Sequence, residues 1–467
     1  MKFSDLSSIK VHIIGINGIG MSALAIYLKK NNVDITGSDI TYNANTINLE
    51  KYKIPVYIGH KISNIKDREI IFYSTAIKNN PEIKEAKKNK IPCYNRSKLL
   101  QLICRDKFTI VVSGSHGKTS TTSFLGHLLV CAGLNPTVIS GGVMQNFGQN
   151  IYLTNSKYVV VEADESDGTF THLQPDVAVL TNIDDDHLVH YNNIFDNLLD
   201  SFVMFVENVP FYGYLVINGD DVNTKRISKK ISRAQVKFGQ SKDCDYQITK
   251  ISSSKGKQSF EIIDKKNSKV HKFKINLPGK HNVFNATAAI AVSMEEGIPL
   301  RAIKSGIQEF SGVGRRYEKH ELVINERNIT LIDDYGHHPL EIESNINAYK
   351  EEYPNKKVCM IFQPHRFTRT AQLFDDFVRV LSKTDLLILL DIYSASEKPI
   401  RGIHSRAILE TIKQEGHKNV IYLQSHDHVN DLIMDKIEDF DILVTQGAGS
   451  VSKVCESIKN KWTKSKK

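Results

Sequence analysis

The sequence predicts an α/β protein of three domains, in which mainly parallel sheets are covered by helices. Three blocks of the chain repeat one pattern: a short β-branched strand ends in a polar or glycine turn, and a helical segment follows. The length of 467 residues is too great for one hydrophobic core, since domains usually hold about 100–200 residues. We expect domains at residues 1–105, 106–313 and 314–467, with an antiparallel β insert between Ser232 and Asn276 in the middle one.

The composition is that of a globular protein without a membrane segment. Hydrophobic residues make up 41% and charged residues 24%, and no apolar run approaches the roughly 20 residues that cross a bilayer. The chain enters a strand soon after Met1, which leaves no room there for a secretory signal. We therefore expect a cytoplasmic protein with no membrane partner.

The cysteines and the charge narrow the class of ligand. The six cysteines include no C-x₂-C pair, which argues against a disulfide framework and a zinc knuckle. The net charge of +9 favours anionic ligands, but the lysines are spread over the whole chain. No recognition motif or aromatic-interleaved basic patch accompanies them, so we expect no nucleic-acid partner.

The first block opens with a strand, residues 11–14, that runs into a glycine turn. Residues 15–20 carry three glycines spaced G-x-x-G-x-G, and Asp39 follows at the end of the next strand. An acid at that distance is where a dinucleotide-binding fold places its ribose ligand, so an NAD-dependent dehydrogenase is an alternative. Asn17 stands where that fingerprint has its second glycine, which weakens the alternative. The block therefore predicts a nucleotide site. The polar turn at Ser74 follows another strand of the block, and such strand exits are where open α/β sheets bind ligands.

The second block contains the most informative motif, a strand that runs straight into the loop Gly114 to Thr119. The two glycines of this loop let backbone N–H groups face a phosphate, and the following helix N-terminus adds partial positive charge. Lys118 supplies a point charge and Thr119 a hydroxyl for Mg²⁺. The standard P-loop would need glycine at Val112, so the motif is a short form, G-x-H-G-K-T. A P-loop switch or motor is an alternative that leaves the other two blocks unexplained.

Acidic residues follow two further strands of this block. Residues 162–167 crowd four carboxylates after the strand 158–161, and an Asp-Asp-Asp-His run ending at His187 follows the strand 177–182. Mg²⁺ prefers oxygen ligands, so a carboxylate, Thr119 and phosphate oxygens suit it better than an imidazole. Two acidic clusters behind a phosphate loop predict a metal-nucleotide site.

The third block begins after a glycine-flanked hinge candidate at residues 312–314. Just before it, a helix places Asn282 and Asn285 on one face, three residues apart. Polar residues again stand at strand exits in the block itself. Arg366 and Arg369 follow one of these strands, and guanidinium groups bind carboxylates and phosphates through two parallel hydrogen bonds.

Taken together, six segments resemble the Mur ligase family in order and over nearly the whole chain. The family's fold implies a Rossmann-like N-terminal domain for a UDP sugar, a central P-loop ATPase-type parallel sheet with an antiparallel β insert, and a Rossmann-like C-terminal domain for an amino acid. The segments that carry the resemblance are Gly15 to Ser22, Gly114 to Thr119, Glu162 to Asp167, His281 to Ala286, Asp333 to Pro339 and Gln363 to Thr370.

The resemblance also implies an activity. The family's alanine-adding branch joins L-alanine to the lactyl carboxylate of UDP-N-acetylmuramate through an acyl phosphate, using ATP and Mg²⁺, in the synthesis of peptidoglycan precursors. Other branches use a carbamylated lysine, and the segment Leu198 to Met204 contains no lysine, which fits the alanine-adding branch. A recycling ligase that attaches a preformed tripeptide is the alternative within the family. We expect a monomer or weak homodimer.

The resemblance implies roles for residues at matching positions. For ATP these are Gly114, Ser115, His116, Gly117, Lys118, Thr119, Ser120, Asn282, Asn285, Arg316 and Asp334. For Mg²⁺ they are Thr119, Glu162 and His187, with Glu165 as the second choice for the acidic ligand. For the UDP sugar they are Gly15, Gly18, Gly20, Ser38, Asp39 and Ser74, and for the amino acid Tyr335, His337, Arg366 and Arg369. The implied catalytic residues are Lys118, Glu162, His187, Arg316, Asp334 and His337.

Overall fold

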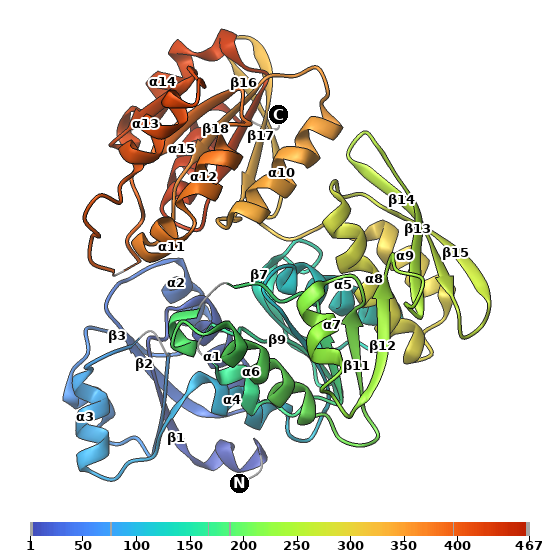
Figure 1. Ribbon diagram of the computed structural model, residues 1–467. Coiled ribbons are helices and arrows are strands. Elements are labelled where there is room, and N and C mark those ends of the chain that lie inside the picture. Colours follow the sequence, from blue (N-terminus) through green and yellow to red (C-terminus); the bar gives the residue numbers. More distant parts are fainter. Residues whose placement is uncertain (1–2, 75–76, 167, 186–187, 396, 464–467) are drawn as a thin grey trace. The chain divides into compact units, whose positions relative to one another are not determined.

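The computed structural model describes residues 3–74, 77–166, 168–185, 188–395 and 397–463. These residues form three sheets flanked by helices, which confirms the predicted three-domain α/β fold (Figure 1). The chain divides into two compact units. The first holds residues up to 250 together with 260–274 and 283–310, and the second holds 251–259, 275–282 and 311–467.

The first sheet has five strands in the order β3-β2-β1-β4-β5, all of them parallel. Alternate residues of β1 point to opposite faces, so that Ile13 packs with the helices on one face and Ile14 with those on the other. The elements are β1 (Lys10–Ile14), α1 (Ile19–Lys30), β2 (Asp34–Asp39), α2 (Ala44–Lys51), β3 (Val56–Ile58), β4 (Ile70–Tyr73), α3 (Pro81–Lys88), β5 (Cys93–Asn95) and α4 (Arg96–Cys104).

Helix α1 is buried almost all round. Every residue from Met21 to Leu28 is buried. The helix covers the first sheet and also contacts β7 (Thr137–Met144) and β8 (Gln149–Tyr152) of the next sheet. One continuous hydrophobic core therefore joins the first two sheets, across the border expected at residues 105 and 106.

The second sheet has ten strands in the order β15-β14-β13-β12-β11-β10-β6-β9-β7-β8. Neighbouring strands are parallel throughout the run β7-β9-β6-β10-β11-β12-β13. The carboxyl ends of β6, β9 and β10 therefore lie at the same edge of the sheet. The remaining elements are β6 (Phe108–Ser113), α5 (Lys118–Cys131), β9 (Tyr158–Glu162), β10 (Val177–Leu180), α6 (Phe195–Glu207), β11 (Tyr214–Asn218), α7 (Val222–Ser228), β12 (Ala234–Gly239), β13 (Tyr246–Ser254), β14 (Lys257–Asp264), β15 (Lys269–Ile275), α8 (Lys280–Glu295) and α9 (Leu300–Glu309).

The third sheet has six strands in the order β16-β17-β21-β18-β19-β20, with only β16 antiparallel to its neighbour. Helices cover both faces, since Met360 packs in one hydrophobic core and its neighbour Cys359 in the other. The elements are β16 (Glu318–Ile324), β17 (Arg327–Asp334), α10 (Pro339–Glu352), β18 (Val358–Phe362), α11 (Phe367–Gln372), α12 (Phe374–Leu381), β19 (Leu386–Leu390), α13 (Ser405–Gln414), β20 (Val420–Leu423), α14 (Val429–Asp435), β21 (Ile442–Gln446) and α15 (Val451–Trp462).

Among the described residues, none of the helices has both the length and the apolar character needed to cross a membrane.

Candidate active site

The loop between β6 and α5 is held close to the end of the neighbouring strand β10. Gly114 has φ +133° and Gly117, the residue before α5, has φ +81°, a region that favours glycine. A β-carbon on Gly114 would lie 2.2 Å from the Thr181 hydroxyl oxygen and 2.8 Å from the Asn182 carbonyl oxygen. Glycine at 114 is therefore required both by the backbone conformation and by the close approach.

Asn182 fixes the loop through both ends of its side chain. Its Oδ1 accepts the backbone N–H of His116 at 2.8 Å, and its Nδ2 donates to the His116 carbonyl at 3.0 Å. Its own carbonyl accepts the N–H of Ser115 at 3.0 Å. Sequence reasoning assigned no role to Asn182, although its place at the exit of a strand beside β6 was a usable signal.

Lys118 lies in the first turn of α5 and points back into the loop. Its Nζ donates to the carbonyls of Gly114 at 2.6 Å and Ser115 at 3.1 Å, and forms an ion pair with Glu165 Oε2 at 2.7 Å. Burial lowers the pKa of Lys118, but the charges of Glu165 and Asp164 outweigh burial and hold the pKa above its usual range. Lys118 is therefore a cation at neutral pH.

Glu165 is fully buried and belongs to a cluster with more negative than positive charge. Burial raises its pKa to about 7, the Asp164 charge acts in the same direction, and the Lys118 charge opposes them. In the part of the chain that the structure describes, its second oxygen, Oε1, has no hydrogen-bond partner. A buried oxygen of this kind is suited to a further cation.

Glu162, the last residue of β9, reaches the start of α5. Its Oε1 accepts a hydrogen bond from the Thr119 hydroxyl at 2.8 Å, and its Oε2 accepts from the Gly141 N–H at 2.5 Å. Two carboxylates and one hydroxyl therefore meet beside Lys118, and all their donor atoms are the oxygens that Mg²⁺ prefers. The donor atoms of these residues therefore fit that ion.

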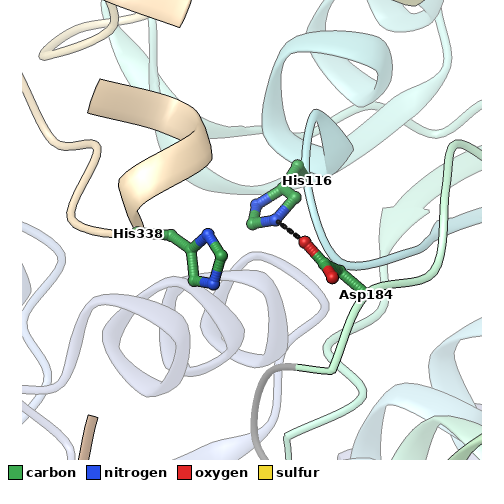
Figure 2. A group of neighbouring side chains, drawn as sticks. All are labelled: His116, Asp184 and His338. Atoms are coloured by element: carbon green, nitrogen blue, oxygen red, sulfur yellow. Dashed lines mark hydrogen bonds and ion pairs between the residues drawn. The ribbon is translucent and has the colours of Figure 1, made fainter. Parts of the chain in front are cut away.

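The acidic run after β10 is only partly described. His116 Nε2 lies 3.3 Å from Asp184 Oδ2, which adds another link between the loop and this strand exit (Figure 2). His187, predicted as a metal ligand, lies outside the described residues.

The two predicted asparagines of α8 are both buried and make different contacts. Asn285 Oδ1 accepts from the Thr121 hydroxyl at 3.4 Å and would lie 2.3 Å from a β-carbon on Gly117. Asn282 Nδ2 donates to the Pro278 carbonyl at 2.8 Å. Asn285 is thus packed against the loop. Together with it, the structure gathers around the exit of β6 the predicted residues Gly114, Ser115, His116, Gly117, Lys118, Thr119, Ser120, Glu162 and Glu165.

The glycine turn after β1 is built around Asp39. The Asp39 carboxylate accepts the backbone N–H of Asn17 at 2.9 Å, and the Asn17 side chain donates to the Thr41 carbonyl at 2.6 Å. Ser38 is buried, and its hydroxyl donates to Glu82 at 2.6 Å. The remaining predicted residues of this site stand at the exits of β1 and β4 and in the first turn of α1: Gly15, Gly18, Gly20 and Ser74.

In the second unit, Asp334 is used to fix the backbone at the end of β17. Its carboxylate accepts the N–H groups of Tyr317 at 2.7 Å and Gly336 at 2.6 Å. Burial raises its pKa, while the Arg316 charge opposes that effect. Arg316 lies over the exposed ring of Tyr335 at 5.3 Å. The structure thus places Arg316, Asp334 and Tyr335 side by side at the end of β17.

His337 joins a second group at the exits of β17, β18 and β19. Its ring lies 5.3 Å from that of His365, which stacks on Tyr393 at 5.5 Å. Arg369 Nη1 lies 3.4 Å from His365 Nδ1. Arg366 has φ +71°, and within the described residues its buried Nε has no hydrogen-bond partner. Sequence reasoning assigned no role to His365 and Tyr393, although both follow strands of the sheet.

A cavity of about 910 Å³ lies at the opposite end of β6 from this loop. Phe108, which starts β6, lines it together with Phe72, Tyr94, Lys107 and Tyr212. The loop residues are not among those that line it in the described part of the chain. The cavity is therefore separate from the predicted phosphate site.

Three family models match the chain in order. The model of the Mur ligase family, catalytic domain, matches residues 10–108, the Mur ligase middle domain matches 112–293, and the Mur ligase, glutamate ligase domain, matches 315–449. The chain belongs to the Mur ligase family. This confirms the family predicted from the sequence motifs, and the Mur ligases are ATP-dependent ligases.

Solved Mur ligase structures extend the similarity over the whole chain. The UDP-N-acetylmuramate-alanine ligase MurC from Thermotoga maritima is 29% identical with a TM-score of 0.83, over 97% of this chain and 99% of that one. A murein peptide ligase from Psychrobacter arcticus is 20% identical with a TM-score of 0.71, over 97% and 98%. The UDP-N-acetylmuramate:L-alanyl-gamma-D-glutamyl-meso-diaminopimelate ligase from Neisseria meningitides is 27% identical with a TM-score of 0.61, over 66% and 99%.

Proposed function

We propose that this Mur ligase joins L-alanine to the lactyl carboxylate of UDP-N-acetylmuramate, with conversion of ATP to ADP and phosphate. The observation that carries the proposal is the full-length similarity to the Thermotoga maritima alanine ligase, at 29% identity and a TM-score of 0.83. The full-length similarity to the Psychrobacter arcticus peptide ligase is weaker, at 20% and 0.71.

The sequence of α6 supports the same branch of the family. The helix runs from Phe195 to Glu207 and contains no lysine, whereas the ligases that add later residues use a carbamylated lysine in the corresponding segment. The tripeptide ligase stays as the alternative, because the Neisseria meningitides enzyme is 27% identical over two thirds of this chain.

In the proposed reaction, the main task of the loop after β6 is to neutralise charge. The sugar carboxylate must approach the γ-phosphate of ATP, which is a polyanion, and phosphoryl transfer relies on positioning and electrostatic stabilisation. Lys118 stays charged at neutral pH and already points into the loop. We therefore assign it to the β- and γ-phosphates, whose oxygens would replace the Gly114 and Ser115 carbonyls as its acceptors.

Thr119 and Glu162 are proposed to hold Mg²⁺, and Glu165 would provide a further oxygen from the buried side. When bound, the ion would supply additional positive charge next to the phosphates. Gly114 allows the loop to lie close to Thr181 and Asn182, and Asn285 packs against Gly117 from α8. His187 remains a proposed ligand.

The residues outside the loop after β6 are assigned to the UDP sugar, to alanine and to further contacts with ATP. We propose that the turn after β1 receives the UDP sugar, because its backbone is fixed by Asp39 at the exit of a parallel strand. In the second unit, Arg316 and Asp334 are assigned to ATP. The residues assigned to alanine and the acyl phosphate are Tyr335, His337, Arg366 and Arg369.

The domain borders near residues 105 and 313 stay as proposals. So do the cytoplasmic location and a monomeric or weakly dimeric state.

The test is a phosphate-release assay with matched amino substrates. Purified protein receives ATP, Mg²⁺ and UDP-N-acetylmuramate together with L-alanine, with the tripeptide L-alanyl-γ-D-glutamyl-meso-diaminopimelate, or with neither. We expect phosphate release only with L-alanine, and a product whose mass is increased by one alanyl residue. Release with the tripeptide and not with alanine would assign the recycling activity instead. ATP turnover that is indifferent to both, or consumption of NADH, would exclude the ligase assignment.

A further inference from the structure

A group of three potential metal ligands lies at the end of α5 away from the phosphate loop. His127 and Cys131 are one helical turn apart on α5, and Glu309 is the last residue of α9, which packs on α5 within the same unit. One nitrogen of His127, the sulfur of Cys131 and one carboxylate oxygen of Glu309 all lie within 4.8 Å of one another. These donor types are the ones that proteins use for zinc.

The separation of the first two ligands matches a tetrahedral ion. His127 Nε2 and Cys131 Sγ are 3.6 Å apart. A Zn–N bond of about 2.0–2.1 Å and a Zn–S bond of about 2.3 Å, at the tetrahedral angle, separate the two ligands by about 3.6 Å. The helix therefore presents both ligands at the spacing that such an ion requires, without movement of α5.

The surroundings favour the ligating form of His127. His127 is buried and lies near the rings of Phe147 and Phe310. Burial lowers the pKa of His127, although the Glu309 charge opposes that effect, so the neutral imidazole that binds metals predominates at pH 7. The Ser305 hydroxyl donates to Glu309 Oε1 and orients the carboxylate.

The site is also open to solvent. Glu309 is exposed and Cys131 is half-buried, so an ion can enter without unfolding the unit. Three protein ligands would leave the fourth position for water.

We propose that His127, Cys131 and Glu309 form a binding site for Zn²⁺ or a similar divalent transition ion. Binding displaces the thiol proton of Cys131, which is released to solvent as the Cys131 sulfur bonds to the ion. The bound ion links the last turn of α5 to the last turn of α9, directly before the chain leaves this unit after Phe310. The ion would thus stabilise the helix that begins at the phosphate loop.

The test is a cobalt titration of metal-free, tag-free full-length protein, without nucleotide or sugar. Co²⁺ takes the place of Zn²⁺ and gives a sulfur-to-metal absorption band only when a thiolate is bound. We expect one equivalent of Co²⁺ to produce this band and Zn²⁺ to remove it. Zn²⁺ should also raise the melting temperature of the unit.

Three variants make the test specific. In Cys131→Ser the absorption band should vanish. In Glu309→Gln the affinity for Co²⁺ should fall at least about tenfold, because even the loss of a group that only hydrogen-bonds to a metal ligand costs about that much. Cys93→Ser is the matched control, because Cys93 is likewise half-buried but belongs to β5. It should behave as the natural protein. Circular dichroism of the zinc-free Cys131→Ser variant, and its phosphate release once ATP, Mg²⁺ and the substrates are added, report that the variant is folded.

Two results would overturn the proposal. One is the absence of the absorption band in the natural protein, which would mean that the 3.6 Å contact is only a thiol-imidazole hydrogen bond. The other is an equal zinc-dependent rise in melting temperature in Cys131→Ser, which would place the ion elsewhere. Neither result depends on the substrate of the ligase, so the two proposals fail separately.

Discussion

The glycine turns after β1 and β6 belong to the same compact unit and have the same local plan, but they differ in their charges. Each follows a buried strand and leads into a helix whose first residues have no side-chain cap. In each, an oxygen from a neighbouring strand exit accepts a backbone N–H: Asp39 that of Asn17, and Asn182 that of His116.

The difference lies in what the neighbouring strands add. The turn after β6 receives Lys118 from its own helix and Glu162 and Glu165 from the exit of β9. The turn after β1 has Asp39 as its acidic partner, and Gly18 before α1 has an ordinary φ of −63°. Glycines thus give both turns a backbone that can face an anion, whereas the charged residues from adjacent strands determine which chemistry each turn can support.

The largest expected effect comes from the charge that sets the two turns apart. Lys118→Ala should lower ATP-dependent phosphate release by about a thousandfold or more, as for other groups that stabilise transferring phosphoryl charge. Binding of UDP-N-acetylmuramate, measured by calorimetry, should stay nearly unchanged. The control is Lys225→Ala, which removes an exposed lysine on α7. Equal loss of sugar binding and turnover would mean that the two turns do not bind separate substrates.

The second prediction compares glycines of the two turns. Gly114→Ala places a β-carbon 2.2 Å from the Thr181 hydroxyl oxygen at a φ of +133°, and should lower the free energy of unfolding by roughly 3 kcal/mol or more. In Gly18→Ala, the one close contact that the added β-carbon makes with the described residues is the Gly15 carbonyl, at 3.3 Å, and about 1 kcal/mol or less is expected. Urea denaturation of both variants measures the difference. Similar decreases in unfolding free energy for the two variants would contradict the requirement for a close approach between residue 114 and Thr181.

The third prediction concerns the buried acid beside Lys118. The raised pKa of Glu165, about 7, means that the folded state holds this proton more tightly than the unfolded state. The contribution of Glu165 to stability is therefore present at pH 4 and is lost as the pH rises to 7. Glu165→Gln should remove this loss, so its unfolding free energy relative to the natural protein should rise between pH 5 and 7.5. A constant difference over this range would show that Glu165 ionises normally.

The smallest effect is expected from restoring the standard glycine in the first turn. Asn17→Gly removes the side-chain hydrogen bond to Thr41 but keeps the backbone bond to Asp39. The free energy of unfolding should fall by about 1 kcal/mol, and kcat should change less than about twofold. Thermal unfolding and steady-state kinetics measure the two quantities. A large fall in kcat would indicate that the Asn17 side chain itself contacts a substrate.

The sequence predicts much of the fold because its signals are local. The β-branched strand before Gly114 and the Lys118-Thr119 pair after it define a strand, a turn and a helix without any distant contact. The same reasoning places Glu162 at a strand end. It does not reveal that α1 is buried on both sides, because its second contact, with β7 and β8, comes from more than a hundred residues away.

What the sequence by itself determined is the set of strand exits and the chemistry of the side chains at them, since a strand and the turn after it depend on adjacent residues. Only the tertiary structure decided which exits meet. The parallel pairing of β6 with β9 and β10 brings Glu165 to Lys118 and Asn182 to His116. The packing of α9 on α5 likewise brings Glu309 to His127. All of these contacts join residues far apart in the chain, and no local pattern in the sequence encodes such contacts.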